Sequence, residues 1–153
     1  KLVKKTGYPG MKILQFAFDA SGESDYLPHN YTNNCVVYTG THDNDTVNGW
    51  ITTMSRKDLA FTKKYLNVKR TTELCETLIR TALGSVADTA IIPMQDYLGL
   101  GGEARINTPS TLGGNWEWRM ERGACTEALS KHMLELTQIY GRIVPKSSRK
   151  KTK

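Results

Sequence analysis

Residues 35–50, CVVYTGTHDNDTVNGW, decide how the rest of the chain is interpreted. Residues 35–38 are apolar and rich in β-branched and aromatic side chains, which predicts a buried strand. The run passes directly into a polar segment that contains His42, Asp43 and Asp45. In a β/α barrel, side chains just beyond the carboxyl end of a strand point into the active-site bowl. Asn and Asp beside Gly are also ordinary turn and helix-capping residues, so the local pattern leaves a catalytic site and a plain turn both open.

Two further apolar segments predict strands on either side of this one. Residues 11–18 are almost continuously apolar, as expected for a strand covered on both faces of a parallel sheet. Residues 89–94 contain Ala-Ile-Ile and predict a third strand. Apolar residues at helical spacing, together with Ser55 as an N-cap, predict intervening helices. The predicted helices cover residues 45–54, 55–65, 72–83 and 126–140. Strands that alternate with helices are typical of an α/β fold with a parallel sheet.

The remaining segments are predicted to be long loops. Residues 19–34 and 99–115 are polar or rich in Gly, and loops of this length are usually functional or disordered. Trp116 and Trp118 follow the second loop. Aromatic planes stack on sugar rings, but paired Trp residues are also common core anchors, and the sequence leaves both interpretations open. In the last helix we expect a buried stripe formed by Leu129, Met133, Leu136 and Tyr140. We expect His132, beside that stripe, to be structural.

Five blocks occur in an order that resembles one enzyme family. They are GYPGMKILQFAF at residues 7–18, YLPHN at 26–30, VVYTGTHDND at 36–45, IPMQD at 92–96 with LGLG at 98–101 and EAR at 103–105, and GNWEWR at 114–119. Together they are similar to amylomaltase, the 4-alpha-glucanotransferase or disproportionating enzyme family of the alpha-amylase clan. The resemblance runs over nearly the whole chain. It implies the carboxyl-terminal part, about strands six to eight with their helices, of a (β/α)8 TIM barrel.

The resemblance also implies a reaction, retaining transfer of an α-1,4-glucan segment in starch, glycogen or maltodextrin metabolism. Such a transfer needs a carboxylate nucleophile and a carboxylic acid that protonates the leaving oxygen. In the family these two groups come from strands upstream of the matched blocks, whereas the third carboxylate matches Asp43, the expected transition-state stabiliser. Neighbouring residues are expected to bind the sugar, and no metal or cofactor is expected. The expected substrate-binding residues are His42, Asn44, Asn107, Asn115 and Trp116.

Length agrees with part of a larger barrel. A chain of 153 residues is long enough for one domain with a core. A closed β/α barrel needs roughly 250 residues. We therefore expect residues 1–145 to form a partial glucanotransferase barrel, whose missing amino-terminal portion would be a partner, and residues 146–153 to form a basic tail.

The net charge of +6 arises at the two ends of the chain. Residues 1–5 and 146–153 supply eight basic residues and no acidic ones, so residues 6–145 carry a net charge of −2. The body is therefore not predicted to bind a polyanion. The tail is predicted to be a solvated, disordered end, with binding to nucleic acid or to an anionic surface as the alternative.

Three cysteines, Cys35, Cys75 and Cys125, are far apart and form no Cys-x-x-Cys pair. This spacing argues against zinc and against a disulfide framework. Each lies in or beside an apolar run, where a free thiol behaves as a small hydrophobe, so we expect a reducing compartment. The expected location is the cytoplasm, or a plastid in a plant or alga. No apolar run approaches the length of a membrane span.

Three classes of function follow from these observations. The first is an enzyme, a 4-alpha-glucanotransferase whose activity needs the upstream portion of the barrel. The second is a non-catalytic fragment or partner subunit that binds α-glucans. The third is an interaction role for the basic tail.

Overall fold

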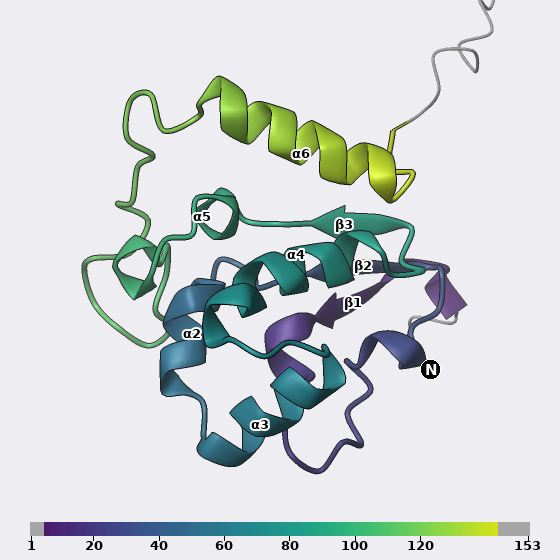
Figure 1. Cartoon of the computed structure of the whole chain (residues 1–153). Coiled ribbons are helices and arrows are strands. Elements are labelled where there is room, and N and C mark those ends of the chain that lie inside the picture. Colours follow the sequence, from purple (N-terminus) through teal and green to yellow (C-terminus); the bar gives the residue numbers. More distant parts are fainter. Residues whose placement is uncertain (1–4, 144–153) are drawn as a thin grey trace, which may run out of the picture.

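The computed structural model describes residues 5–143, and these form a three-stranded parallel sheet covered by helices (Figure 1). Strands β1 (Gly10–Ile13), β2 (Cys35–Tyr38) and β3 (Thr89–Ile91) lie in the order β1-β2-β3. β2 has the predicted bounds and forms the centre of the sheet. The register aligns the last residue of β2 with the last residues of β1 and β3. All three carboxyl ends therefore lie at one edge of the sheet.

Three of the described helices begin where the side chain of a capping residue accepts a hydrogen bond from a free amide of the first turn. Ser55 accepts a hydrogen bond from the Asp58 amide at the start of the second helix, which confirms its predicted role as an N-cap. Thr126 caps the last helix in the same way. The α-helices are α2 (Val47–Thr53), α3 (Arg56–Tyr65), α4 (Leu74–Leu83), α5 (Met94–Tyr97) and α6 (Glu127–Ile139). The 3₁₀ turns are η1 (Leu14–Phe16), η2 (Pro28–Asn30), η3 (Thr71–Glu73) and η4 (Gly102–Ala104).

One face of the sheet forms the core with the helices. Cys35 and Val37 alternate inward along β2 and are buried. Leu78 and Ile79 of α4 are buried in the same cluster, as the helical spacing predicted. Leu136 of α6 also belongs to this core. Burying side chains of this size stabilises the fold by about 1.5–3 kcal/mol each, so the sheet, α4 and α6 are held together mainly by apolar contacts.

The opposite face of the sheet is more exposed. Met11 and Ile91 point to this face and are 57% and 45% exposed, and Phe16 just beyond β1 is 51% exposed. The prediction that the first strand is covered on both faces is therefore wrong for the described residues, because the helices pack on the opposite face of the sheet, the one that carries Cys35 and Val37.

Both outer strands are shorter than predicted. β1 ends at Ile13 because the chain turns into η1, which buries Leu14 and Gln15 together. β3 ends at Ile91 because Pro93 has no N–H to offer a neighbouring strand and instead precedes α5.

Two burial predictions need correction. Of the predicted stripe on α6, only Leu136 is fully buried, since the helix lies at the surface and contacts the rest of the fold mainly through α4. Cys125 is exposed because it lies in the irregular segment before α6, whereas the other two cysteines are buried. The predicted basic tail, residues 146–153, lies outside the described residues.

Candidate functional site

A cavity of about 760 Å³ opens where the strands end. Its apolar wall comes from the exposed face of the sheet and includes Met11, Tyr38 and Ile91. Its polar wall is the loop of residues 39–46, which joins β2 to α2 and carries His42 and Asp43. The volume is within the range of small-molecule sites, and the position matches that of the active site in β/α barrels.

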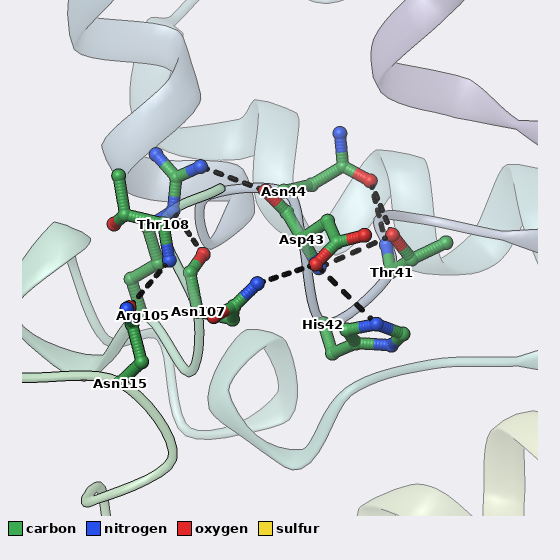
Figure 2. Close-up of polar contacts among 8 residues, drawn as sticks. All are labelled: Thr41, His42, Asp43, Asn44, Arg105, Asn107, Thr108 and Asn115. Atoms are coloured by element: carbon green, nitrogen blue, oxygen red, sulfur yellow. Dashed lines mark hydrogen bonds and ion pairs between the residues drawn. The ribbon is translucent and has the colours of Figure 1, made fainter. Parts of the chain in front are cut away.

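The loop is shaped by hydrogen bonds within itself. The Asn44 side-chain oxygen accepts from the Thr41 amide at 2.9 Å and from the Thr41 hydroxyl at 2.8 Å. The Asn44 amide donates to the Thr41 carbonyl at 3.1 Å. This closed turn presents His42 and Asp43, both exposed, at its tip. Asn44, predicted to bind substrate, thus uses its oxygen to shape the turn (Figure 2).

Asp43 is held from two directions (Figure 2). The Asn107 amide donates to its carboxylate at 2.6 Å, and the His42 ring nitrogen lies 3.3 Å from the same oxygen. Arg105 donates to the Asp43 carbonyl at 2.7 Å. Three of the predicted site residues, His42, Asp43 and Asn107, are therefore brought together. The Asp43 side chain is 50% exposed, so a ligand in the cavity can reach its oxygens.

Trp116 lies beside this group. Its ring centroid is 5.0 Å from that of His42, with the two planes tilted by 38°. The side chain is 56% exposed, so Trp116 is not a core anchor. Its backbone has a φ of 66°, and its amide donates to the Ile106 carbonyl at 2.7 Å, which connects it to the loop that carries Asn107. Trp118 is half-buried in a separate cavity of about 450 Å³.

Asn115 closes its own loop and does not join this group. Its side-chain oxygen accepts from the Thr108 amide at 2.8 Å, and its nitrogen donates to the Thr111 hydroxyl at 3.0 Å. Within the described part of the chain, these bonds keep its polar atoms inside residues 108–115 (Figure 2).

The helix predicted over residues 45–54 begins two positions later, at Val47, so Asp45 is not its first residue. The N-cap of α2 is Thr46, whose hydroxyl accepts from the Gly49 amide at 3.1 Å. Asp45 instead accepts from the Thr46 amide at 2.7 Å. Its carboxylate packs against Gly49 and Gly102, where any side chain would meet it.

The sequence did not reveal the residues whose hydrogen bonds hold the loop of residues 39–46 in place. Arg105 and Asp96 both belong to blocks quoted above, but no role was assigned to either. Gln15, buried in η1, donates to the Asp45 carbonyl at 2.8 Å. Asp96 is 2% exposed and accepts hydrogen bonds from Thr39 and Val47. Burial raises the pKa of the Asp96 carboxyl, whereas these two hydrogen bonds act in the opposite direction.

Neither a metal-binding cluster nor a membrane-spanning helix occurs within residues 5–143. Among them, no group of three or more His, Cys, Asp or Glu side chains is arranged to hold a metal ion. None of the helices in this range is both long and apolar enough to cross a membrane.

Comparisons with known proteins agree with one another. The family model described as 4-alpha-glucanotransferase matches residues 1–126. The 4-alpha-glucanotransferase of Clostridium butyricum is 50% identical over 140 residues, which cover 91% of this chain and 29% of that enzyme. The chloroplastic/amyloplastic enzyme of Arabidopsis thaliana is 44% identical over 146 residues, which cover 94% of this chain and 25% of the relative.

A solved structure gives the same result. The amylomaltase from Streptococcus agalactiae in complex with acarbose superimposes with a TM-score of 0.87 at 41% identity, covering 92% of this chain and 28% of that protein. The chain thus spans less than a third of the length of each of these relatives. Because the family model matches most of its residues and the fold superimposes, the chain belongs to the 4-alpha-glucanotransferase family.

Proposed function

We propose that this chain is the part of a 4-alpha-glucanotransferase that supplies Asp43 to the active site. The enzyme transfers an α-1,4-glucan segment to glucose or another glucan by a retaining mechanism. In this proposal β1, β2 and β3 are the sixth, seventh and eighth strands of a (β/α)8 barrel. The parallel order β1-β2-β3 and the shared carboxyl edge support this assignment.

The observation that carries the proposal is the position of Asp43. Its carboxylate lies beyond the carboxyl end of β2, on the wall of the 760 Å³ cavity, beside His42 and Asn107. An exposed carboxylate with fixed neighbours suits hydrogen bonding to the hydroxyls of a sugar whose ring distorts during reaction.

The chemistry requires groups beyond this chain. A carboxylic acid protonates the glycosidic oxygen while a carboxylate attacks the anomeric carbon, which gives a covalent glycosyl-enzyme. An acceptor sugar hydroxyl then displaces the carboxylate and returns its proton to the former acid. We assign both groups to the portion of the relatives that this chain does not match. Asp43 would hydrogen-bond the hydroxyls next to the reacting carbon and bind most tightly at the transition state.

The neighbours of Asp43 are proposed to bind the same substrate. His42 and Trp116 form an exposed pair of rings that can contact an apolar sugar face. Asn44 and Asn107 would offer amide groups to hydroxyls, whereas Asn115 would act on the substrate indirectly, by holding the loop of residues 108–115. The partners are α-1,4-glucans such as maltooligosaccharides, starch or glycogen, and the remainder of the barrel. We propose a cytoplasmic location, or a plastid in a plant or alga.

A chimaera tests the proposal directly. The Clostridium butyricum enzyme, with its matching 140 residues replaced by this chain, is expected to disproportionate maltotriose. Asp43→Asn should then lower kcat about 10²- to 10³-fold with little change in KM, because the lost interaction is made mainly in the transition state. Asp45→Asn is the matched control and should lower kcat about tenfold or less, since the Asp45 carboxylate accepts from the Thr46 amide and is not presented at the tip of the turn. A folded chimaera in which Asp45→Asn is the more damaging change would contradict the assignment.

The alternative is a glucan-binding role without turnover. It is favoured by one observation, namely that residues 5–143 form the cavity by themselves. Calorimetric titration of the chain with maltoheptaose separates the two proposals. Binding that Asp43→Asn leaves unchanged, in a chain whose chimaera is inactive, would favour the alternative.

A further inference from the structure

One buried carboxylate joins the two ends of the loop that carries His42 and Asp43. We propose that Asp96 is a positioning residue, which fixes residues 39–46 so that His42 and Asp43 meet Trp116 and Asn107 at the cavity. The consequence for catalysis rests on the proposed function, but the positioning itself does not.

The two oxygens of Asp96 have different partners. Oδ2 accepts from the Thr39 hydroxyl at 2.6 Å, and Oδ1 accepts from the Val47 amide at 2.8 Å. Thr39 is the first residue after β2, and Val47 is the first residue of α2. An eight-residue loop therefore has both of its ends attached to a single side chain that comes from α5, about 50 residues later in the sequence.

Neither donor has a ready substitute. The Val47 amide belongs to the first turn of α2, where amides have no acceptor within the helix. Thr39 and Val47 are both 0% exposed, so water does not reach them from the surface. A buried donor without a partner is unfavourable, and the loop would have to move to satisfy it.

Other contacts tie the loop to the same place but cannot replace Asp96. Gln15 holds the Asp45 carbonyl and Arg105 holds the Asp43 carbonyl, each by one hydrogen bond inside the loop. Gln15 also reaches the Thr39 carbonyl, through its backbone amide at 3.3 Å, but it donates to carbonyls and accepts from neither buried donor. Among residues 5–143, the Asp96 side chain is the one that accepts from both the Thr39 hydroxyl and the Val47 amide. Its own backbone is fixed by the Cys75 thiol, which donates to the Asp96 carbonyl at 3.4 Å.

A buried charge is not needed for the core itself. Replacing buried ionic groups by apolar residues of similar size is often neutral for stability. Only a group with two acceptors, however, can hold a hydroxyl and an amide at once. We therefore assign to Asp96 a role in the position of the loop of residues 39–46, and not in the stability of the core.

The test uses the chain itself and the contact between His42 and Trp116. Nuclear Overhauser effects between the two rings, whose centroids are 5.0 Å apart, report the position of the loop without any need for activity. We expect these signals to be lost in Asp96→Asn and in the isosteric Thr39→Val. Thr39→Ser, which keeps the hydroxyl, should restore them. Asp88→Asn, the same change at an exposed carboxylate, should leave them unchanged.

Methyl spectra of the core accompany each measurement and report whether the fold persists. If Asp96→Asn fails to fold, the pair Thr39→Val and Thr39→Ser decides, because each changes only one partner. Undiminished signals between the His42 and Trp116 rings in folded Thr39→Val would overturn the proposal.

A second readout uses the chimaera. Thr39→Val should lower kcat about 10- to 100-fold with KM little changed, the size of effect expected when a reacting geometry shifts by about 1 Å. If Thr39→Val abolishes the ring signals but the chimaera is inactive even without this substitution, positioning is supported and the proposed function is contradicted. If the unsubstituted chimaera is active but Thr39→Val leaves the ring signals unchanged, positioning alone is overturned.

Discussion

Gly49→Ala is expected to destabilise the protein although it adds a better helix former to α2. Ala in place of Gly inside a helix contributes roughly 0.5–1 kcal/mol of stability. At Gly49, however, an added Cβ would lie 2.4 Å from Oδ1 of Asp45, about 1 Å closer than an ordinary contact. The Asp45 carboxylate would have to move by that amount and would lose its 2.7 Å bond from the Thr46 amide. Overpacking of this kind costs about 1–3 kcal/mol, so a net loss of about 1 kcal/mol is expected.

The Asp45→Ala background should reverse the sign. Without the carboxylate, Gly49→Ala should stabilise by about 0.5–1 kcal/mol, which gives a coupling of about 2 kcal/mol between the two sites. Urea unfolding followed by circular dichroism, at a concentration where the chain is monomeric, measures all four variants. Thr53→Ala, on an exposed position of the same helix whose hydroxyl bonds to Trp50, is the control and should have equal effects in both backgrounds. Equal stabilisation by Gly49→Ala in both backgrounds would refute the steric argument.

Three other predictions follow from burial and hydrogen bonding. With iodoacetamide at about pH 8, Cys125 should be alkylated first because it is exposed. Burial raises the pKa of the Cys75 thiol to about 12 and also raises the pKa of the Cys35 thiol, so these two should react more slowly. Mass mapping that finds Cys35 modified as fast as Cys125 in folded protein would contradict this. Leu78→Ala, at a fully buried position, should cost about 2–5 kcal/mol in urea unfolding, and a loss below about 1 kcal/mol would mean that the core is not packed as described. Arg142→Met should cost about 1–3 kcal/mol, since Arg142 donates to four carbonyls at the end of α4 and in the segment before β3. An unchanged unfolding midpoint would show that these bonds do not contribute.

Local chemistry explains the parts of the fold that the sequence predicted. β2 has its predicted bounds because a short β-branched run is followed at once by Thr39 and Gly40, where the chain leaves the sheet. The start of α3 was readable because Ser55 satisfies free amides through its own side chain, a local interaction. The stripe on α4 was readable because one helix face is buried along its whole length.

The error in the first strand occurred because a distant partner decides where it ends. The pattern of residues 11–18 continues past Ile13, but Gln15 turns inward to reach the Asp45 carbonyl, 30 residues away. The same limit applied to the site. The resemblance pointed to Asp43 and His42, which the structure brings together with Asn107 and Trp116. It could not reveal Asp96, because an Asp in a short apolar segment has no visible role until its partners are known.

The hydrogen bonds around Asp43 have a consequence for the entropy of binding. A flexible side chain that becomes ordered on association costs about 0.5–1.5 kcal/mol, which reduces the affinity for the ligand. Asp43 is already restrained by Asn107, His42 and Arg105, and its loop is closed by Asn44. Most of this ordering is completed when the chain folds. Under the proposed function, a sugar that arrives at the cavity would meet a carboxylate with few rotamers left to lose, and more of the contact energy would be available to discriminate between a relaxed and a distorted ring.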